Sequence, residues 1–202
     1  MGLDALSTKC SVKGYGKVMA YAVNTHQGIV RSYNEDRVSI VLNIMKPPNR
    51  PSQEEWPKCS FFGVYDGHGG SGCADFLRDQ LHQFIVREPC FPQDPYEALR
   101  SGFARAEQEF LEKNYKSSSQ SGERPVIFDR SGSCAIVVLI VGEMCYVANV
   151  GDSRAVLSTG GGGGTASSSQ RVISGPPKVF PLSRDHKPSD ENEKKRIIEA
   201  GG

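Results

Sequence analysis

One stretch, FFGVYDGHGGSGCADFL at residues 61–77, constrains the fold more than any other part of this sequence. Its first residues are almost wholly apolar, with aromatic and β-branched side chains, which predicts a buried strand over 60–65. Apolar residues then recur at helical spacing, which predicts an amphipathic helix over about 71–87. The glycines between the two elements allow a tight turn. The sequence therefore places residues 66–68, Asp-Gly-His, at a strand end.

The same two periodicities occur elsewhere in the chain. Further strands are predicted at 18–23, 37–44, 133–141, 144–150, 153–157 and near 178–182. Further helices are predicted at about 95–115 and 190–200, the second capped by Ser189.

The connections between these elements indicate the fold class. Short turns at Gly142-Glu143 and Gly151-Asp152 predict antiparallel hairpins between consecutive strands. Because hairpins outnumber strand–helix–strand units, we expect an α+β protein with antiparallel sheets and helices packed outside them. The chain stops directly after a helix without a closing strand, so we expect a C-terminal part to be missing.

Composition is typical of a globular rather than a disordered chain, with 38% hydrophobic and 23% charged residues. A net charge of +1 gives no bulk attraction to nucleic acid or to an anionic membrane, so neither is an expected partner. The longest apolar run, at 134–141, is too short for a membrane-spanning helix. The six cysteines form no CxxC pair and no secretory signal precedes them. We therefore expect reduced thiols and a cytoplasmic or nuclear location.

The N-terminus has part of a signal for a lipid anchor. Gly2 follows Met1, as N-myristoylation requires, but the hydroxyl of Ser7 stands one place beyond the favoured position. If Gly2 is acylated, Cys10 could carry the second lipid that stable anchoring needs. The alternative is an unmodified, frayed terminus.

The Asp-Gly-His turn has two interpretations. Asp-Gly is a common turn dipeptide, so Asp66 could simply shape the chain. A carboxylate, an exposed carbonyl and an imidazole at a strand end also fit a hard-metal site, because Mg²⁺ and Mn²⁺ prefer oxygen ligands.

A second cluster, VRSYNEDR, carries adjacent acids and an arginine. Glu35 and Asp36 open a predicted strand, where neighbouring side chains point to opposite faces, so only one can enter a shared site directly. The planar guanidinium of Arg31 suits a phosphate dianion. The alternative is a solvated turn with a local ion pair.

Two later clusters are weaker individually. Asp152 lies in a Gly-Asp turn, where such residues are common without any ligand. Asp185 and His186 could be ligands, but Asp185 fits better as the organiser of the loop that enters the last helix.

Taken together and in order, these motifs point to one family. Arg31-x-x-x-Glu35-Asp36, VYDGHGG, RSGSCA, VANVGDSRAVL and LSRDHKP with EKKRIIEAGG closely resemble the metal-dependent protein Ser/Thr phosphatases of type 2C. The departures are a Pro-rich loop, a glycine run, and Cys134 where the family often has Thr.

The resemblance implies a fold and a domain organisation. Two antiparallel β-sheets would pack as a sandwich flanked by helices. Residues 1–17 would be an N-terminal extension, and 18–202 an incomplete catalytic domain with loop insertions at 45–58 and 158–170. Members of the family continue past the AGG helix into strands that supply two more metal-binding aspartates, so this chain alone would be short of ligands.

It also implies a metal centre of two Mg²⁺ or Mn²⁺ ions at one edge of the sandwich. Asp66 would bridge the ions, and Glu35 and the carbonyl of Gly67 would bind one of them. Asp36 would support the ligands from behind. Asp152 matches a position associated in the family with an additional, weaker metal.

The implied reaction is hydrolysis of phosphoserine and phosphothreonine in proteins by a metal-activated water. Arg31 would hold the substrate phosphate, and His68 would protonate the leaving oxygen. Phosphorylated proteins would be the partners, and the enzyme is expected to be a monomer. The alternative function is a catalytically inactive, phosphatase-like module that binds phosphorylated partners.

Overall fold

A four-stranded antiparallel sheet forms the centre of the computed structural model, which describes residues 9–116, 126–127, 129–159 and 177–202. In spatial order its strands are β10 (Met144–Val150), β9 (Ala135–Val141), β4 (Cys59–Tyr65) and β3 (Arg37–Val41). The hairpin predicted at Gly142-Glu143 is confirmed, since Val141 pairs with Met144. The central strands β4 and β9 are the apolar runs of the sequence, and most of their residues are buried.

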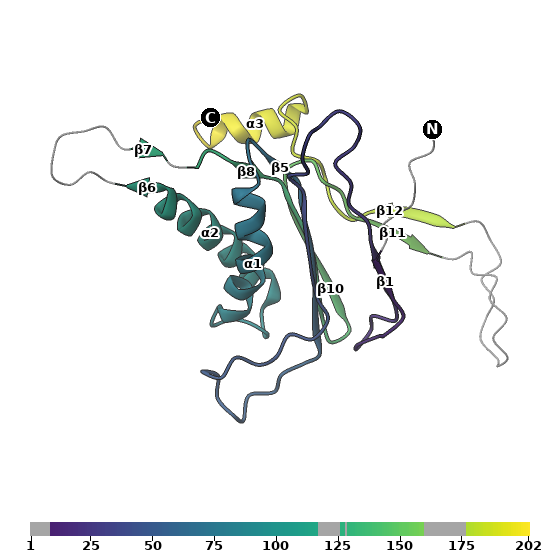
Figure 1. The fold of residues 1–202 in the computed structure, drawn as a ribbon. Coiled ribbons are helices and arrows are strands. Elements are labelled where there is room, and N and C mark those ends of the chain that lie inside the picture. The colour runs from purple at the N-terminus through teal and green to yellow at the C-terminus, as the bar shows by residue number, and fades with distance from the viewer. Residues whose placement is uncertain (1–8, 117–125, 128, 160–176) are drawn as a thin grey trace.

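Two helices, α1 (Gly72–Arg87) and α2 (Pro95–Asn114), cover one face of this sheet (Figure 1). The core between sheet and helices contains fully buried side chains, among them Tyr65, Phe61, Phe91, Leu81, Ile85, Leu139 and Val137. Gly102 of α2 lets the helices approach closely, because a Cβ there would lie 2.5 Å from the Ile85 side chain. Both predicted helices are therefore confirmed, and they hold β4 and its C-terminal turn against the core.

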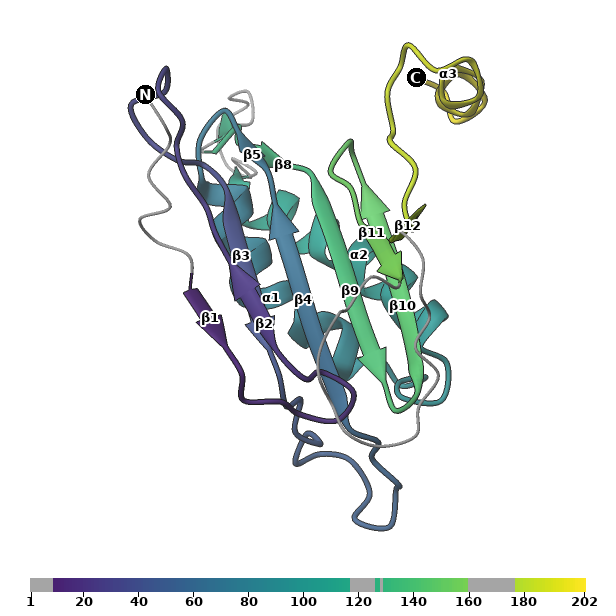
Figure 2. The ribbon, with the colours of Figure 1, turned by 90° about the vertical axis from the view of Figure 1, so that its right-hand side faces the viewer.

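Two small ribbons lie on the side of the sheet opposite the helices (Figures 1 and 2). They are β1 (Lys9–Ser11) with β2 (Tyr21–Val23), and β11 (Val156–Thr159) with β12 (Lys178–Pro181). The layered α+β class with antiparallel sheets is confirmed. In the described ranges the second β layer consists of these two separate ribbons.

Two further strand pairs are short. They are β5 (Gly67–His68) with β8 (Gly132–Ser133), and β6 (Tyr115–Lys116) with β7 (Val126–Ile127). The first pair joins the turn after β4 to the segment before β9. Ser131 of that segment also accepts a hydrogen bond from the Cys73 backbone N–H, which satisfies a free donor at the start of α1.

The hairpin predicted at Gly151-Asp152 is wrong. Strand β11 pairs with β12 and begins at Val156 rather than 153, and among the strands that the structure describes β10 pairs with β9 alone. The backbone groups of Gly151 find other partners: its carbonyl accepts from the His186 N–H at 2.9 Å, and its N–H donates to His186 Nδ1 at 3.4 Å. These bonds direct the chain out of the central sheet.

The last helix, α3 (Glu191–Glu199), is present near its predicted bounds, but its cap differs from the prediction. Asp190, not Ser189, accepts hydrogen bonds from the backbone of Asn192 and Glu193. A carboxylate adds a favourable charge at the helix N-terminus that a hydroxyl lacks. No residue of α3 is buried.

The remaining predictions concern the cysteines, the N-terminus, the glycine-rich loop and membrane-spanning helices. All six cysteines lie in the described ranges and are unpaired, as expected. Gly2 and residues 160–170 of the predicted loop insertion at 158–170 lie outside the described residues, whereas Ser158 and Thr159 belong to β11. Within the described ranges, no helix combines the length and apolar character needed to cross a membrane.

Candidate metal centre

Asp66 is fixed through its backbone at the end of β4. Its carbonyl accepts a hydrogen bond from the Cys134 N–H at 2.9 Å, and the next two residues pair with β8. Gly69 and Gly70 then take positive φ angles of 68° and 125°, which glycine adopts without strain. The predicted turn at a strand end is therefore present, and it leaves the Asp66 side chain exposed.

Gly67 brings a second segment to this turn. A Cβ at Gly67 would lie 2.4 Å from the backbone oxygen of Glu35, so the bare glycine permits this contact. The Glu35 carboxylate is buried, with the residue 6% exposed. Its Oε1 accepts from the Gly70 N–H at 2.6 Å, and its Oε2 pairs with Arg31 Nη1 at 3.2 Å. Arg31, Glu35 and the Asp66 turn are thus held together.

Asp36 lies close to Asp66. Burial, followed by repulsion from the Asp66 carboxylate, raises the pKa of Asp36, and these effects outweigh the attraction of Arg37 and Arg31. Glu35 and Asp36 precede β3, which begins at Arg37, so the predicted alternation of their side chains along a strand does not apply. A carboxylate that raises the pKa of a neighbouring carboxyl group contributes to a local negative potential that favours a bound cation.

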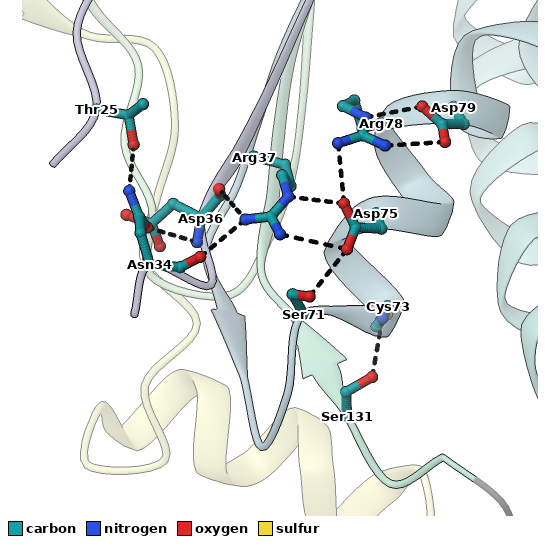
Figure 3. A network of polar contacts seen from close by, with 10 residues as sticks. All are labelled: Thr25, Asn34, Asp36, Arg37, Ser71, Cys73, Asp75, Arg78, Asp79 and Ser131. Carbon is teal, nitrogen blue, oxygen red and sulfur yellow. Dashed lines mark hydrogen bonds and ion pairs between the residues drawn. The ribbon is translucent and has the colours of Figure 1, made fainter. Parts of the chain in front are cut away.

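Arg37 holds the acidic loop in place, a role that the sequence analysis missed. Its Nη1 donates to the carbonyls of Asn34 and Asp36 at 2.9 and 2.8 Å, and its Nε donates to Asp75 Oδ1 at 2.7 Å (Figure 3). Asp75 lies 38 residues away in the first turn of α1. The guanidinium therefore ties the loop that carries Glu35 to the helix that follows the turn.

Asp75 has further partners that orient it. Its carboxylate accepts from the Ser71 hydroxyl at 2.9 Å and pairs with Arg78 at 2.9 Å (Figure 3). The hydrogen bond from Arg37, supported by Ser71 and Arg78, holds the pKa of Asp75 below its ordinary value. An ionised carboxylate is thus kept opposite Arg37 at neutral pH. No local pattern in the sequence links residues so far apart.

Asp66, Cys134 and Asp152 form a cluster of possible metal ligands. One donor atom from each lies within 4.8 Å of the other two. Cys134 Sγ is 3.7 Å from Asp152 Oδ1, and Asp152 Oδ2 is 3.4 Å from Lys187 Nζ. The convergence of Asp66 and Asp152 agrees with the sequence analysis. Cys134 appeared there only as a departure from the family, so its place beside both carboxylates is new.

Asp185, His186 and His68 lie outside this cluster. Asp185 makes a bidentate pair with Arg154, both contacts at 2.7 Å, and this pair lowers the pKa of Asp185 to about 2. His186 bonds to Gly151. Both residues therefore organise the approach to α3, the role preferred for Asp185 in the sequence analysis. His68 is exposed and packs over Gly132, where a Cβ would lie 2.5 Å from its Nε2.

Comparison with known proteins identifies the family of this chain. The family model for protein phosphatase 2C matches residues 27–202, a range that contains every site residue described above. The chain belongs to the protein phosphatase 2C family. The resemblance found in the motifs is thereby confirmed.

Individual relatives agree with the family assignment. The chain is 36% identical over 195 residues to protein phosphatase 2C homolog 2 of Hypocrea jecorina, and 38% identical over 200 residues to probable protein phosphatase 2C 55 of Oryza sativa subsp. japonica. These matches cover 96% and 98% of this chain. They cover 38% and 43% of the relatives, so the chain spans less than half of their length.

Solved structures show the same fold. A sex-determining protein of C. elegans is similar over 85% of this chain and 36% of its own, with a TM-score of 0.57 and 25% identity. Serine-threonine phosphatase 2C from Toxoplasma gondii is similar over 85% of this chain and 52% of its own, with a TM-score of 0.51 and 22% identity. The second likeness supports the fold alone.

Type 2C phosphatases are metal-dependent, and the donors in this chain fit a divalent cation. Asp66 and Asp152 present carboxylates to the same space, and Asp36 is close enough for Asp66 to raise its pKa. Carboxylates in such a group repel one another until a cation neutralises them. The chemistry of the donor set is therefore consistent with the family.

Proposed function

We propose that this chain carries the first part of a protein phosphatase that hydrolyses phosphoserine and phosphothreonine with Mg²⁺ or Mn²⁺. In this proposal residues 18–202 belong to the catalytic domain, with loop insertions at 45–58 and 158–170. The observation that carries it is the convergence of Asp66, Asp152 and the acidic loop at the C-terminal end of β4.

The bound ions would neutralise the phosphate dianion and lower the pKa of a water molecule toward ~7. Asp66 and the carbonyl of Gly67 would hold the ions together with Glu35, whose Oε2 now pairs with Arg31. If Glu35 turns to an ion, Arg31 is released. Its exposed guanidinium is then free to bind the substrate phosphate in a bidentate manner.

Two further residues complete this assignment. Asp36 would support the ligands from behind, and its raised pKa is consistent with a carboxylate awaiting a cation. His68 is exposed beside the turn and would donate a proton to the leaving serine or threonine oxygen. An alkoxide is a poor leaving group, and imidazole titrates close enough to neutrality to protonate it.

The same proposal includes phosphorylated proteins as substrates, a monomeric enzyme and a cytoplasmic or nuclear location. Unpaired thiols at all six cysteines are consistent with a reducing compartment. A membrane tether would apply only if Gly2 is acylated.

A module that binds phosphoproteins without turnover is the second candidate function. One observation favours it: both carboxylate oxygens of Glu35 already have partners, Arg31 and the Gly70 N–H. A Glu35 that keeps these bonds would leave the ions under-liganded, whereas Arg31 would still offer a charged guanidinium at the surface.

The two functions are distinguished by phosphate release from a phosphothreonine peptide with Mn²⁺. The experiment compares residues 1–202 with a chain extended to its natural C-terminus, each alone and as Asp66→Asn. Asp79→Asn, an exposed aspartate of α1, is the matched control. We expect turnover by the extended chain, unchanged by Asp79→Asn and abolished by chelation or by Asp66→Asn.

Turnover that survives both chelation and Asp66→Asn contradicts the metal-dependent mechanism. Peptide binding by both chains without turnover, weakened by Arg31→Met, favours the binding module.

A further inference from the structure

We propose that Cys134 supplies a sulfur ligand to a divalent cation held between Asp66 and Asp152. The mixed sulfur and oxygen site would prefer thiophilic cations, such as Zn²⁺, Cd²⁺ and Co²⁺, over Mg²⁺. This inference goes beyond the proposed function: it shares Asp66 and Asp152 with it but adds a sulfur ligand and needs no turnover.

The distances between the donors match those around one ion. A tetrahedral Zn²⁺ binds sulfur at about 2.3 Å and carboxylate oxygen at about 2.1 Å, which places the two donors about 3.6 Å apart. Cys134 Sγ and Asp152 Oδ1 are 3.7 Å apart. The Asp66 donor lies within 4.8 Å of both, so a small rotation of this exposed side chain would complete three protein ligands.

Backbone contacts place the sulfur in this position. The hydrogen bond from the Cys134 N–H to the Asp66 carbonyl joins the segment before β9 to the end of β4. A Cβ at Gly151 would lie 2.4 Å from Cys134 Sγ, so only a glycine leaves room for the sulfur where it lies. Gly151 also takes a φ of 101°, which a side chain would disfavour.

Lys187 already places a positive charge beside Asp152. Its Nζ lies 3.4 Å from Asp152 Oδ2, the oxygen that does not face the sulfur, and equally 3.4 Å from Asp185 Oδ2 outside the cluster. The Lys187 side chain is about half exposed and is flexible, so it can withdraw. Lys187 would therefore act as a competing positive charge next to the proposed ion.

The chemistry of binding is an exchange of a metal for a proton. The Cys134 thiol, which now contacts Asp152, loses its proton to solvent, and the sulfur electron pair forms the bond to the cation. No oxidation or reduction is involved. The alternative is that the thiol only donates a weak hydrogen bond to Asp152 and never binds a metal.

The test is a Co²⁺ titration of residues 1–202 followed by absorption in the near ultraviolet, where a cobalt–thiolate bond gives a charge-transfer band. Cys134→Ser removes the sulfur and keeps the size of the side chain. Cys145→Ser, an exposed cysteine of β10, is the matched control. We expect the band in the unmodified chain and in Cys145→Ser, and no band in Cys134→Ser.

Affinity gives a second measurement on the same variants. Cys134→Ser should weaken Zn²⁺ binding on the order of 10- to 100-fold, the loss that even an indirect partner of a metal ligand causes, and should leave Mg²⁺ binding nearly unchanged. Lys187→Gln should tighten Co²⁺ binding, whereas Lys195→Gln on α3 should not. Absence of the band in the unmodified chain, or its persistence in Cys134→Ser, overturns the proposal.

The result is separable from the test of phosphatase activity. The absorption band is read without substrate, so a band in a chain that never releases phosphate upholds the sulfur ligand and contradicts only the enzyme. Mn²⁺-dependent turnover without the band upholds the enzyme and contradicts the sulfur ligand.

Discussion

The two sides of the candidate metal centre are built differently. On one side, the loop before β3 and the turn after β4 rest on the buried core, with Glu35 enclosed and Arg37 bonded to α1. On the other side, Asp152 and Asp185 are held by ion pairs with Lys187 and Arg154. Strands β11 and β12 are exposed along their whole length, and α3 buries no residue.

This difference has consequences for how each side keeps its geometry. Packed side chains hold their positions largely independently of ionic strength. Exposed ion pairs contribute little to stability and weaken as salt screens them. The Asp66 side should therefore be preformed, whereas the Asp152 side should depend on solution conditions.

The largest effect should come from the core beneath the Asp66 side. Leu81 of α1 is fully buried, whereas Ile198 of α3 is 61% exposed. Leu81→Ala should lower the free energy of unfolding by about 2–5 kcal/mol, because it removes buried methyl groups and leaves a cavity. Ile198→Ala should change it little. Urea denaturation of both variants makes the comparison, and equal losses would show that the two sides are packed alike.

A smaller effect should follow from removing the arginine between loop and helix. Arg37→Met keeps the aliphatic stem but deletes the bonds to Asn34, Asp36 and Asp75. We expect a loss of about 1–2 kcal/mol, below the full value of charge-assisted bonds because Asp75 is partly exposed. Weaker Mn²⁺ binding, measured by electron paramagnetic resonance, should accompany the loss.

The control for this prediction is Arg154→Met, which breaks the exposed pair with Asp185. Its effect on stability should be smaller and should vanish in high salt, whereas that of Arg37→Met should persist.

The pH dependence of stability gives a second check on the Arg37–Asp75 pair. The pKa of Asp75 is below 3.8 in the folded chain, so its stabilising contribution is present above that pH and is lost as the pH falls through the folded pKa. The gap between the native and Arg37→Met curves should narrow as the pH falls below 3.8, and the part that remains reflects the bonds to the Asn34 and Asp36 carbonyls; a gap that does not change with pH would exclude Asp75 as a partner that matters.

How far the sequence predicts the fold depends on the kind of contact. The strands at β4 and β9 and the helices α1 and α2 follow from local periodicity, because burial imposes a repeat on each element. Local periodicity could not show that the predicted hairpin at Gly151 is absent. Its Gly-Asp pair is typical of a turn, but His186, 35 residues later, takes the backbone bonds that a hairpin would use.

The candidate site shows the same division. Asp66 and Glu35 could be found because motifs at element ends present polar groups to a shared edge. Arg37 could not, since its partner Asp75 is recognisable only once α1 has docked on the sheet. Cys134 was visible as an unusual residue, but its distance from Asp152 depends on how the chain leaves β10.

The smallest effect should come from Asp36, whose negative charge destabilises the folded, metal-free chain slightly. The folded pKa of Asp36 is above the ordinary 3.8, so its ionised form costs stability at neutral pH, and the cost disappears once the pH falls below 3.8. Asp36→Asn should therefore stabilise the metal-free chain slightly at pH 7, within about 0.5 kcal/mol. It should also weaken Mn²⁺ binding.

Asp79→Asn is the control with the opposite sign, because Arg78 lowers the pKa of Asp79 and its carboxylate stabilises the fold. Thermal unfolding of both variants between pH 3 and pH 7 makes the comparison. The gain from Asp36→Asn should shrink as the pH falls, since the native carboxyl then becomes neutral as well. A loss of stability at pH 7 would mean that the Arg31 and Arg37 guanidinium groups outweigh burial and the Asp66 charge together. The packed side would then be arranged for stability rather than for a cation.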